Sequence, residues 1–149
     1  MSDPGRWIRD REPNDTPELA VLMCELGYET KRTEMETRLR LILSNPAYKT
    51  FVAVMDGCVC GMIGSLTYRS YEHDDPSRRI LALVTLSAAR RCGIGRALIA
   101  TAEKDFAQRG IRRVALDTRF TREDANKFYE SLGYGRNGWR FVKQLFMST

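Results

Sequence analysis

A nearly continuous apolar run that leads into a glycine-rich turn constrains this chain more than any other feature. Ile80-Leu81-Ala82-Leu83-Val84 carries no charge, which is typical of a central strand covered on both faces. A short connection then reaches Arg90-Arg91-Cys92-Gly93-Ile94-Gly95-Arg96. Apolar residues recur after this turn with helical spacing: Ile94, Leu98, Ala102 and Phe106. A buried strand, a glycine turn and a helix together predict an α/β sheet protein.

The rest of the chain also divides into strand-like and helix-like segments. Strands are predicted at residues 7–9, 50–55, 59–68, 80–84, 114–116 and 140–146. Helices are predicted at residues 16–27, 33–45, about 93–109, and from Thr121 or Arg122 to Gly133. Asp56-Gly57 is a strong hairpin turn between two of the strands. No repeat or linker interrupts the 149 residues, so we expect a single domain over 1–149 with helices packed on one mixed sheet.

Capping signals mark where the first two helices begin. Thr16 precedes Pro17, so we expect Thr16 as the N-cap, with proline at the first helical position. Thr33-Glu34-Met35-Glu36 has the spacing of a capping box. Gly27 is a natural end for the first of these helices.

The glycine turn has the composition of a phosphate-binding site. Gly93 and Gly95 allow the backbone to approach a ligand without a Cβ collision. The first turn of a helix also offers unpaired N–H groups and the positive end of the helix dipole. Arg90, Arg91 and Arg96 add positive charge at the same place. The alternative is a tight turn that needs glycine only for its conformation.

Two motifs in order resemble a known family. The run from Leu83 to Leu98 resembles the acetyl-CoA signature of the GNAT family of N-acetyltransferases, in which a strand is followed by Arg/Gln-x-x-Gly-x-Gly/Ala and a helix. Asp124-Ala125-Asn126-Lys127-Phe128-Tyr129-Glu130-Ser131-Leu132-Gly133-Tyr134 resembles the later motif of the same family. The resemblance implies the acyl-CoA N-acyltransferase (GNAT) fold, a mixed, mostly antiparallel sheet flanked by helices. It also implies an enzyme that uses acetyl-CoA as a co-substrate to acetylate an amine.

The resemblance assigns roles to individual positions. Backbone groups of Leu83, Val84 and Thr85 would pair with the pantetheine arm, and an N–H of this strand would polarise the thioester carbonyl. Tyr129 would protonate the departing thiolate, and Asn126 is a weaker candidate for a pantetheine contact. The residues implied to hold the pyrophosphate are Arg90, Arg91, Cys92, Gly93, Ile94, Gly95 and Arg96.

The chain departs from the family pattern at several positions. Ser87 stands where many members have proline, and Arg91 stands where glycine is common. Arg122 replaces a common asparagine, which puts that cofactor contact in doubt. Ala82 lies where some relatives carry an acidic residue that acts as a base, so the general base is unassigned.

One loop offers titratable groups for the missing base. Glu72, His73, Asp74 and Asp75 cluster before the apolar strand, and histidine titrates near neutral pH. A solvated acidic loop explains the same residues. A single histidine and a Cys58-x-Cys60 spacing give little material for a metal site, so we expect no metal and four reduced, mostly buried cysteines.

The charge and hydropathy of the chain indicate whether it binds nucleic acid or membranes and where in the cell we expect it. The formal net charge is +5, but no basic–aromatic repeat suggests a nucleic-acid surface. No apolar run approaches the ~20 residues of a membrane helix, and Met1-Ser2-Asp3-Pro4-Gly5-Arg6 lacks a signal-peptide core. We therefore expect a cytoplasmic protein that binds neither nucleic acid nor membrane.

Several functions stay open besides that of a small-molecule acetyltransferase. A dinucleotide site would suit Gly93-x-Gly95 with Asp117, but Leu98 takes the third glycine position. A non-catalytic acyl-CoA-binding regulatory module, or an enzyme that acetylates a protein N-terminus or lysine, would share the same motifs.

The acceptor amine is not fixed by these motifs. The resemblance extends most naturally to acetyltransferases of small amines, including aminoglycosides and aminoalkylphosphonates. The acidic loop would suit a cationic acceptor, whereas Arg69, Arg78 and Arg136 would suit an anionic one. Family members often dimerise through sheet edges or C-terminal strands, so the resemblance also allows a homodimer.

Overall fold

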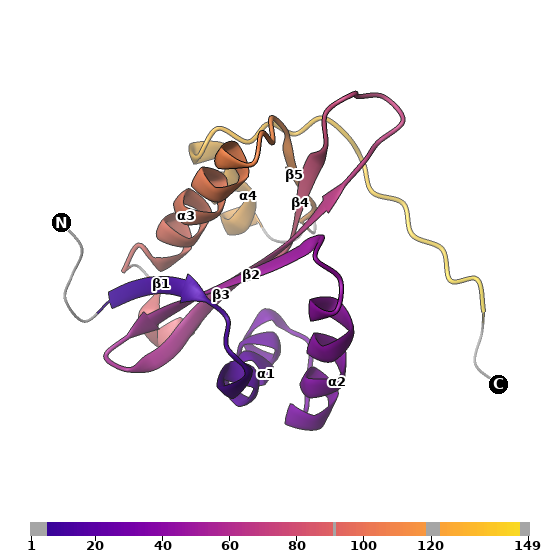
Figure 1. The fold of residues 1–149 in the computed structure, drawn as a ribbon. Coiled ribbons are helices and arrows are strands. Elements are labelled where there is room, and N and C mark those ends of the chain that lie inside the picture. Colours follow the sequence, from indigo (N-terminus) through magenta and orange to yellow (C-terminus); the bar gives the residue numbers. More distant parts are fainter. Residues whose placement is uncertain (1–5, 91, 119–122, 147–149) are drawn as a thin grey trace. The chain divides into compact units, whose positions relative to one another are not determined.

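The computed structural model describes residues 6–90, 92–118 and 123–146, in two compact units that meet in the sequence between Leu116 and Asp117 (Figure 1). The strands of the first unit are β1 (Arg6–Asp10), β2 (Tyr48–Met55), β3 (Cys58–Tyr68), β4 (Ser77–Thr85) and β5 (Val114–Leu116). Its helices are α1 (Thr16–Leu26), α2 (Arg32–Leu43) and α3 (Ile94–Gln108), with the short 3-10 turns η1 (Pro13–Asp15) and η2 (Ser87–Ala89). The second unit contains α4 (Glu123–Ser131).

The five strands form one mixed sheet in the order β1-β2-β3-β4-β5. The first three pairings are antiparallel and β4 pairs with β5 in parallel. The β2–β3 hairpin turns at Asp56-Gly57, where both residues have positive φ, as a type I′ turn requires. The prediction of a mixed, mostly antiparallel sheet is confirmed.

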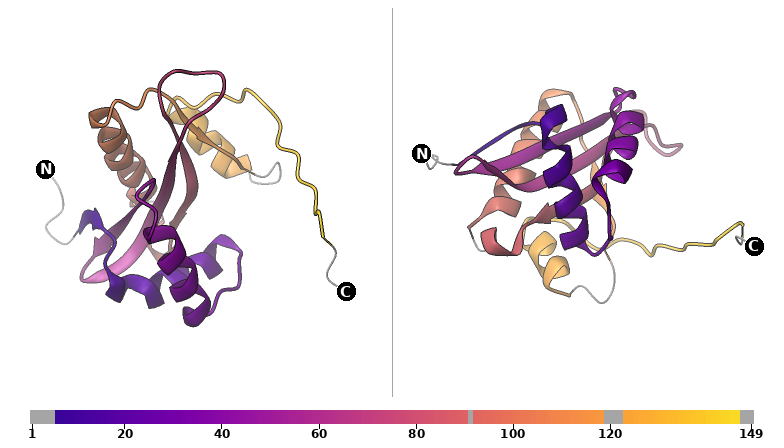
Figure 2. Two further views of the ribbon diagram at one scale, coloured as in Figure 1. Left: turned by 45° about the vertical axis from the view of Figure 1, so that its right-hand side comes forward. Right: turned by 90° about the horizontal axis from the view of Figure 1, so that it is seen from below.

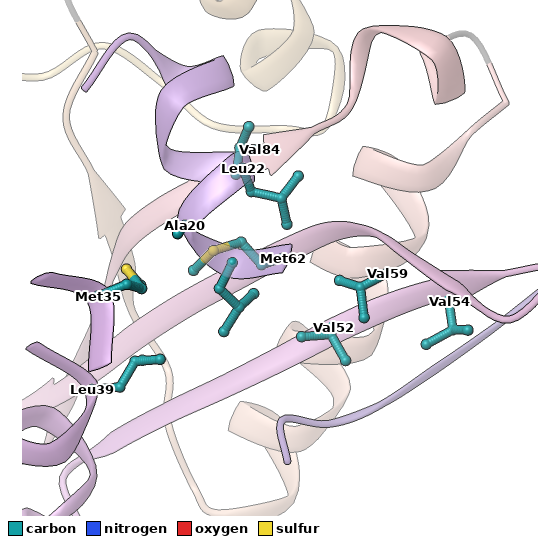
Figure 3. Packing of buried hydrophobic residues seen from close by; sticks show 10 residues of the cluster. Ala20, Leu22, Met35, Leu39, Val52, Val54, Val59, Met62 and Val84 are labelled. Carbon is teal, nitrogen blue, oxygen red and sulfur yellow. The ribbon is translucent and has the colours of Figure 1, made fainter. Parts of the chain in front are cut away.

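Helices cover both faces of this sheet (Figures 1 and 2). On one face, α1 and α2 bury a cluster with side chains of β2, β3 and β4 (Figure 3). Met62 belongs to this cluster, and its neighbour Gly61 faces the other side. A Cβ on Gly61 would lie 3.0 Å from Cγ2 of Ile94 and 3.1 Å from Cδ1 of Leu98. Helix α3 therefore packs closely against the opposite face.

A β-bulge in β4 reverses which way its side chains face. Ser65 of β3 pairs with Ile80 and Gly64 pairs with Ala82, so Leu81 is an extra residue in β4. Before the bulge, the guanidinium of Arg78 lies 4.9 Å from the ring centre of Phe106 on α3. After it, Val84 belongs to the cluster under α1 and α2. Residues of equal parity in a regular strand would share one face, so the bulge divides β4 into two distinct halves.

The first and last residues of α1, α2 and α3 lie within two residues of those predicted from the sequence. The residues that cap α1 and α2 differ from those predicted. Helix α1 ends at Gly27, whose φ of 111° is left-handed. Its N-cap is Asp15 and not Thr16, because the 3-10 turn η1 leads directly into α1 and Thr16 already lies inside the helix. The capping-box glutamate of α2 is Glu34, two residues earlier than the predicted Glu36, and it accepts the N–H of Lys31 at 2.8 Å.

Two further predictions were wrong. Residues 140–146 form neither helix nor strand, although Phe141, Val142, Leu145 and Phe146 are apolar. A strand needs a neighbour to satisfy its backbone groups, and side chains such as Phe141 and Phe146 are 92% and 88% exposed. The four cysteines, all of them among the described residues, form no disulfide, as predicted, but only Cys60 of the four is buried. The predicted start of the last helix at Thr121 or Arg122 lies outside the described residues.

Candidate functional site

The N-terminus of α3 has the backbone geometry of an anion site. Gly93 is the N-cap, with a left-handed φ of 75° that glycine adopts without strain. The first bond inside the helix runs from the N–H of Ala97 to the carbonyl of Gly93 at 3.0 Å. The N–H groups of Ile94, Gly95 and Arg96 precede that bond, so the helix itself gives them no acceptor. They lie at the positive end of the helix dipole.

The predicted phosphate-binding side chains surround this helix start. Arg96 occupies the first turn of α3 and is exposed. Arg90 precedes the turn, with 58% of its side chain exposed, and Cys92 is also exposed. Arg91, predicted at the same place, lies outside the described residues. The described positions therefore present positive charge and backbone donors to solvent together.

The second half of β4 has a backbone edge that no described strand covers. The parallel pairing with β5 involves Arg78, Arg79 and Ile80 and goes no further. Beyond the bulge, the N–H of Leu86 bonds the carbonyl of Cys60 on β3 at 2.8 Å. Backbone groups alternate in direction along a strand, so Leu83 and Thr85 direct their N–H and C=O groups away from β3. These groups lie on the open edge, whereas Val84, which was predicted to pair with the pantetheine arm as well, directs its backbone groups to β3.

The open edge and the helix start are joined by the short connection 86–93. An extended ligand with amide groups can add to such an edge as a further strand. A phosphate at its end can then reach the N–H groups of α3. Pantetheine is an amide-containing chain attached to a pyrophosphate, so the residues present fit CoA.

Glu25 of α1 holds the connection between these two elements. Its Oε1 accepts the N–H of Ser87 at 2.7 Å and lies 3.5 Å from Nη2 of Arg90. Hydrogen bonds from the hydroxyl and the N–H of Ser87, together with the charge of Arg90, lower the pKa of the Glu25 carboxyl. Nothing in the sequence indicates a role for Glu25, because no local motif links it to a residue 62 positions away.

The loop proposed as a source of the general base lies at the wrong end of the sheet. Residues 69–76 connect β3 to the beginning of β4, whereas Leu83 and Thr85 lie near its end. Nine residues of strand, at about 3.3 Å each, place these ends roughly 25 Å apart. His73 and its acidic neighbours therefore cannot take a proton directly at the open edge. Ala82 has no side-chain group that could accept a proton, and it packs against the apolar cluster under α1 and α2. This position therefore provides no general base.

The two side chains predicted from the later motif both lie on α4, in the second unit. Tyr129 is half-buried, and its ring centre lies 5.5 Å from that of Phe128 and 6.0 Å from that of Tyr134. The buried Asn126 accepts a hydrogen bond from the hydroxyl of Thr118 through Oδ1. Its carbonyl oxygen thus has a partner within its own unit, and a pantetheine contact stays a prediction.

The arginines predicted for an anionic acceptor are largely engaged elsewhere. Arg78 is 3% exposed and donates to the hydroxyls of Ser65 and Thr67, so it cannot meet a ligand. Burial lowers its pKa. Arg136 contacts two carboxylates of α4, at 2.6 Å and 3.2 Å. Arg69 donates to the carbonyl of Asp74 at 2.6 Å.

Comparison with known proteins identifies the family. The model of the acetyltransferase (GNAT) family matches residues 16–134, a range that includes both motifs and the whole candidate site. This chain belongs to the GNAT acetyltransferase family. The resemblance seen in the sequence is confirmed, and so is the GNAT fold.

Its relatives include small-molecule enzymes. The aminoalkylphosphonate N-acetyltransferase of Salmonella typhimurium is 32% identical over 143 residues, which cover 93% of this chain and 90% of that protein. A GNAT family acetyltransferase from Staphylococcus aureus has 25% identity and a TM-score of 0.82, with 95% of this chain and 99% of that chain covered. These similarities to acetyltransferases support an acyltransferase activity.

A more distant solved structure supports the fold. An aminoglycoside N-acetyltransferase in complex with CoA superimposes with a TM-score of 0.82 at 19% identity, covering 95% of each chain. Among the described residues, none of the helices is both long and apolar enough to cross a lipid bilayer.

Proposed function

We propose that this GNAT protein transfers the acetyl group of acetyl-CoA to a primary amine of a small molecule. The observation that carries the proposal is the open backbone edge of Leu83 and Thr85, joined by a short connection to the N-terminus of α3. One element suits an amide chain and the other suits a pyrophosphate. A bound CoA complex of a structural relative supports the same ligand.

The proposed binding roles divide between backbone and side chains. The N–H groups of Ile94, Gly95 and Arg96 would bind the pyrophosphate through the helix start. The exposed arginines Arg90 and Arg96 would neutralise its charge. The backbone of Leu83 and Thr85 would fix the pantetheine arm, and this fixes the direction in which the thioester enters.

An outward N–H on β4 would stabilise the charge that develops during attack. When the amine adds to the thioester carbon, the carbonyl oxygen gains negative charge. A fixed backbone donor aimed at that oxygen contributes up to about 100- to 1,000-fold in rate. Leu83 is our candidate, because it is the first residue beyond the bulge whose N–H is directed to the open edge.

Two protons must also move. The attacking amine must be neutral, since an ammonium has no lone pair, and the departing thiolate must gain a proton. We assign the second proton to the hydroxyl of Tyr129, on the strength of the later GNAT motif. The group that deprotonates the amine stays unassigned.

The preferred acceptor class is an aminoalkylphosphonate. This choice rests on the 32% identical relative that bears that name. Aminoglycosides are the second class, suggested by a structural relative of lower identity. Protein amines and a purely regulatory role are the remaining outcomes of the test.

Thiol release from acetyl-CoA, measured over a panel of amines, tests the proposal. The panel contains aminoalkylphosphonates, aminoglycosides and a lysine peptide, with Tyr129→Phe as a matched variant that lacks only the hydroxyl. We expect turnover with a small amine and a kcat about 100-fold lower in the variant. Acetyl-CoA binding without turnover of any amine would favour the regulatory module, and equal activity of the two proteins would remove Tyr129 from the mechanism.

A further inference from the structure

The carboxylate of Glu25 is the link between α1 and the connection that precedes the helix start of α3. Glu25 lies in the last turn of α1, and its side chain is 27% exposed. It accepts the N–H of Ser87, the first residue of η2, at 2.7 Å. It also lies 3.5 Å from the guanidinium of Arg90, one residue beyond that turn. One carboxylate thus contacts the connection at two points.

Ser87 is the hydrogen-bonding partner of the Glu25 carboxylate. Ser87 offers both a backbone N–H and a hydroxyl, and these two groups are the largest causes of the lowered pKa of Glu25. A proline at this position would have no N–H. Ser87 therefore provides the hydrogen-bond donors for the Glu25 carboxylate.

We propose that Glu25 is a positioning residue for acetyl-CoA binding, an inference that rests on the proposed function. By holding Ser87 and Arg90, Glu25 keeps the connection ordered between the open edge of β4 and the N-terminus of α3. A pre-ordered loop binds more tightly because less conformational entropy is lost on binding. Glu25 contacts the loop and not the reacting atoms, so its loss raises KM for acetyl-CoA and leaves kcat unchanged.

The same helix provides a matched control. The Oε2 atom of Glu18 accepts the N–H of Val59 at 2.8 Å, beside the β2–β3 hairpin and away from the connection. Glu18 and Glu25 therefore each accept a backbone N–H from outside α1, Glu18 from a strand and Glu25 from the connection, about two helical turns apart. If both glutamates served only to stabilise the fold, replacing either one by alanine would change acetyl-CoA affinity by a similar factor.

Calorimetric titration of acetyl-CoA into the wild type, Glu25→Ala and Glu18→Ala tests the assignment. We expect about fivefold weaker binding for Glu25→Ala, the loss of a charge-assisted hydrogen bond to an ordered loop. Glu18→Ala should bind within about twofold of the wild type, although its melting temperature falls. Equal affinities of the two variants would overturn the inference. A wild type that does not bind acetyl-CoA would instead overturn the proposed function.

Ser87→Pro tests whether Glu25 acts through Ser87. The preceding Leu86 has φ −57° and ψ 143°, which suits a residue before proline, and the first position of a helical turn tolerates proline. In the Ser87→Pro background, Glu25→Ala should change acetyl-CoA affinity by less than about twofold, because the exposed pair with Arg90 contributes little by itself.

A full fivefold effect of Glu25→Ala in the Ser87→Pro background would contradict the proposed route. If Ser87→Pro does not fold, Glu25→Gln answers the same question in the wild-type background. Its amide oxygen keeps an acceptor for Ser87 but loses the charge, so its affinity should lie between those of the wild type and Glu25→Ala. An affinity of Glu25→Gln as low as that of Glu25→Ala would show that charge alone matters, and would contradict a role through Ser87.

Discussion

The two halves of β4 differ both in sequence and in surroundings: Ser77–Ile80 contains two arginines, whereas Leu81–Thr85 carries no charge. From Ser77 to Ile80 the strand has neighbours on both sides, β3 and β5, and Arg78 is buried under α3. From Leu81 to Thr85 it has β3 alone among the described strands. The first half therefore stabilises the fold through its side chains, and we propose that the second half offers its backbone to acetyl-CoA.

The bulge at Leu81 marks the boundary between these two roles. It turns Ala82 and Val84 toward the cluster under α1 and α2, and it accompanies the end of the pairing with β5. Bulges commonly re-aim a strand near functional sites. The lesson is that a site can be built from backbone groups by ending a strand pairing, without any special side chain.

The largest expected effect comes from removing the outward N–H of Leu83. Proline is tolerated in a strand where the lost N–H has no strand partner, so Leu83→Pro should fold. We expect kcat to fall about 100-fold, the loss of one oxyanion donor. Steady-state thiol release measures kcat, and a thermal melt shows whether the Leu83→Pro variant is folded.

The control for that variant is Val84→Pro, one residue along the same strand. The N–H of Val84 is directed to β3, so this proline removes a bond of the sheet and should unfold the protein or lower its melting temperature strongly. A Leu83→Pro variant with full kcat would show that this N–H has no role in the reaction.

A smaller effect is expected from Arg78→Ala in the first half. The change removes hydrogen bonds to Ser65 and Thr67 and the packing on Phe106. We expect the free energy of unfolding to fall by about 2 kcal/mol, measured by urea denaturation. The KM for acetyl-CoA should be unchanged below the melting temperature. A large rise in that KM would contradict the division of roles along β4.

The smallest effects compare two glycines of β3 that lie opposite the second half of β4. Gly61 pairs with Thr85 and Gly64 with Ala82. A Cβ at Gly61 would crowd the first turns of α3, whereas at Gly64 the nearest atom is the Cε of Met62 at 3.9 Å. We expect Gly61→Ala to cost about 1 kcal/mol of unfolding free energy and to weaken acetyl-CoA binding slightly.

Gly64→Ala is the matched variant and should be neutral for both unfolding and binding. Urea denaturation and calorimetry measure the two quantities. Equal behaviour of the two alanine variants would mean that the close contact of α3 with the sheet does not position the helix start.

The sequence predicted the elements with strong local signals. Gly27 ended a helix, Asp56-Gly57 made the hairpin turn, and Gly93 began α3, because each of these glycines has a φ that other residues rarely adopt. The start of α3 at Gly93 was predictable for the same reason, and phosphate binding at this helix start stays a proposal.

Features that depend on long-range pairing were not predictable. The bulge at Leu81 is visible only from the register against β3, and Glu25 meets Ser87 only when α1 packs on the sheet. Residues 140–146 contain four apolar side chains but have no strand partner among the described residues. Hydrophobicity indicates that a segment can be buried and does not specify what covers it.

Isothermal titration of acetyl-CoA into the wild type and Arg96→Glu tests the central claim most directly. Arg112→Glu serves as the charge-matched control, since Arg112 contacts Asp75 near the beginning of β4. We predict micromolar binding by the wild type and by Arg112→Glu, and at least about tenfold weaker binding by Arg96→Glu, because reversed charge at the helix start repels phosphate. No binding by the wild type, or equal losses in both variants, would contradict an acetyl-CoA site at the end of β4.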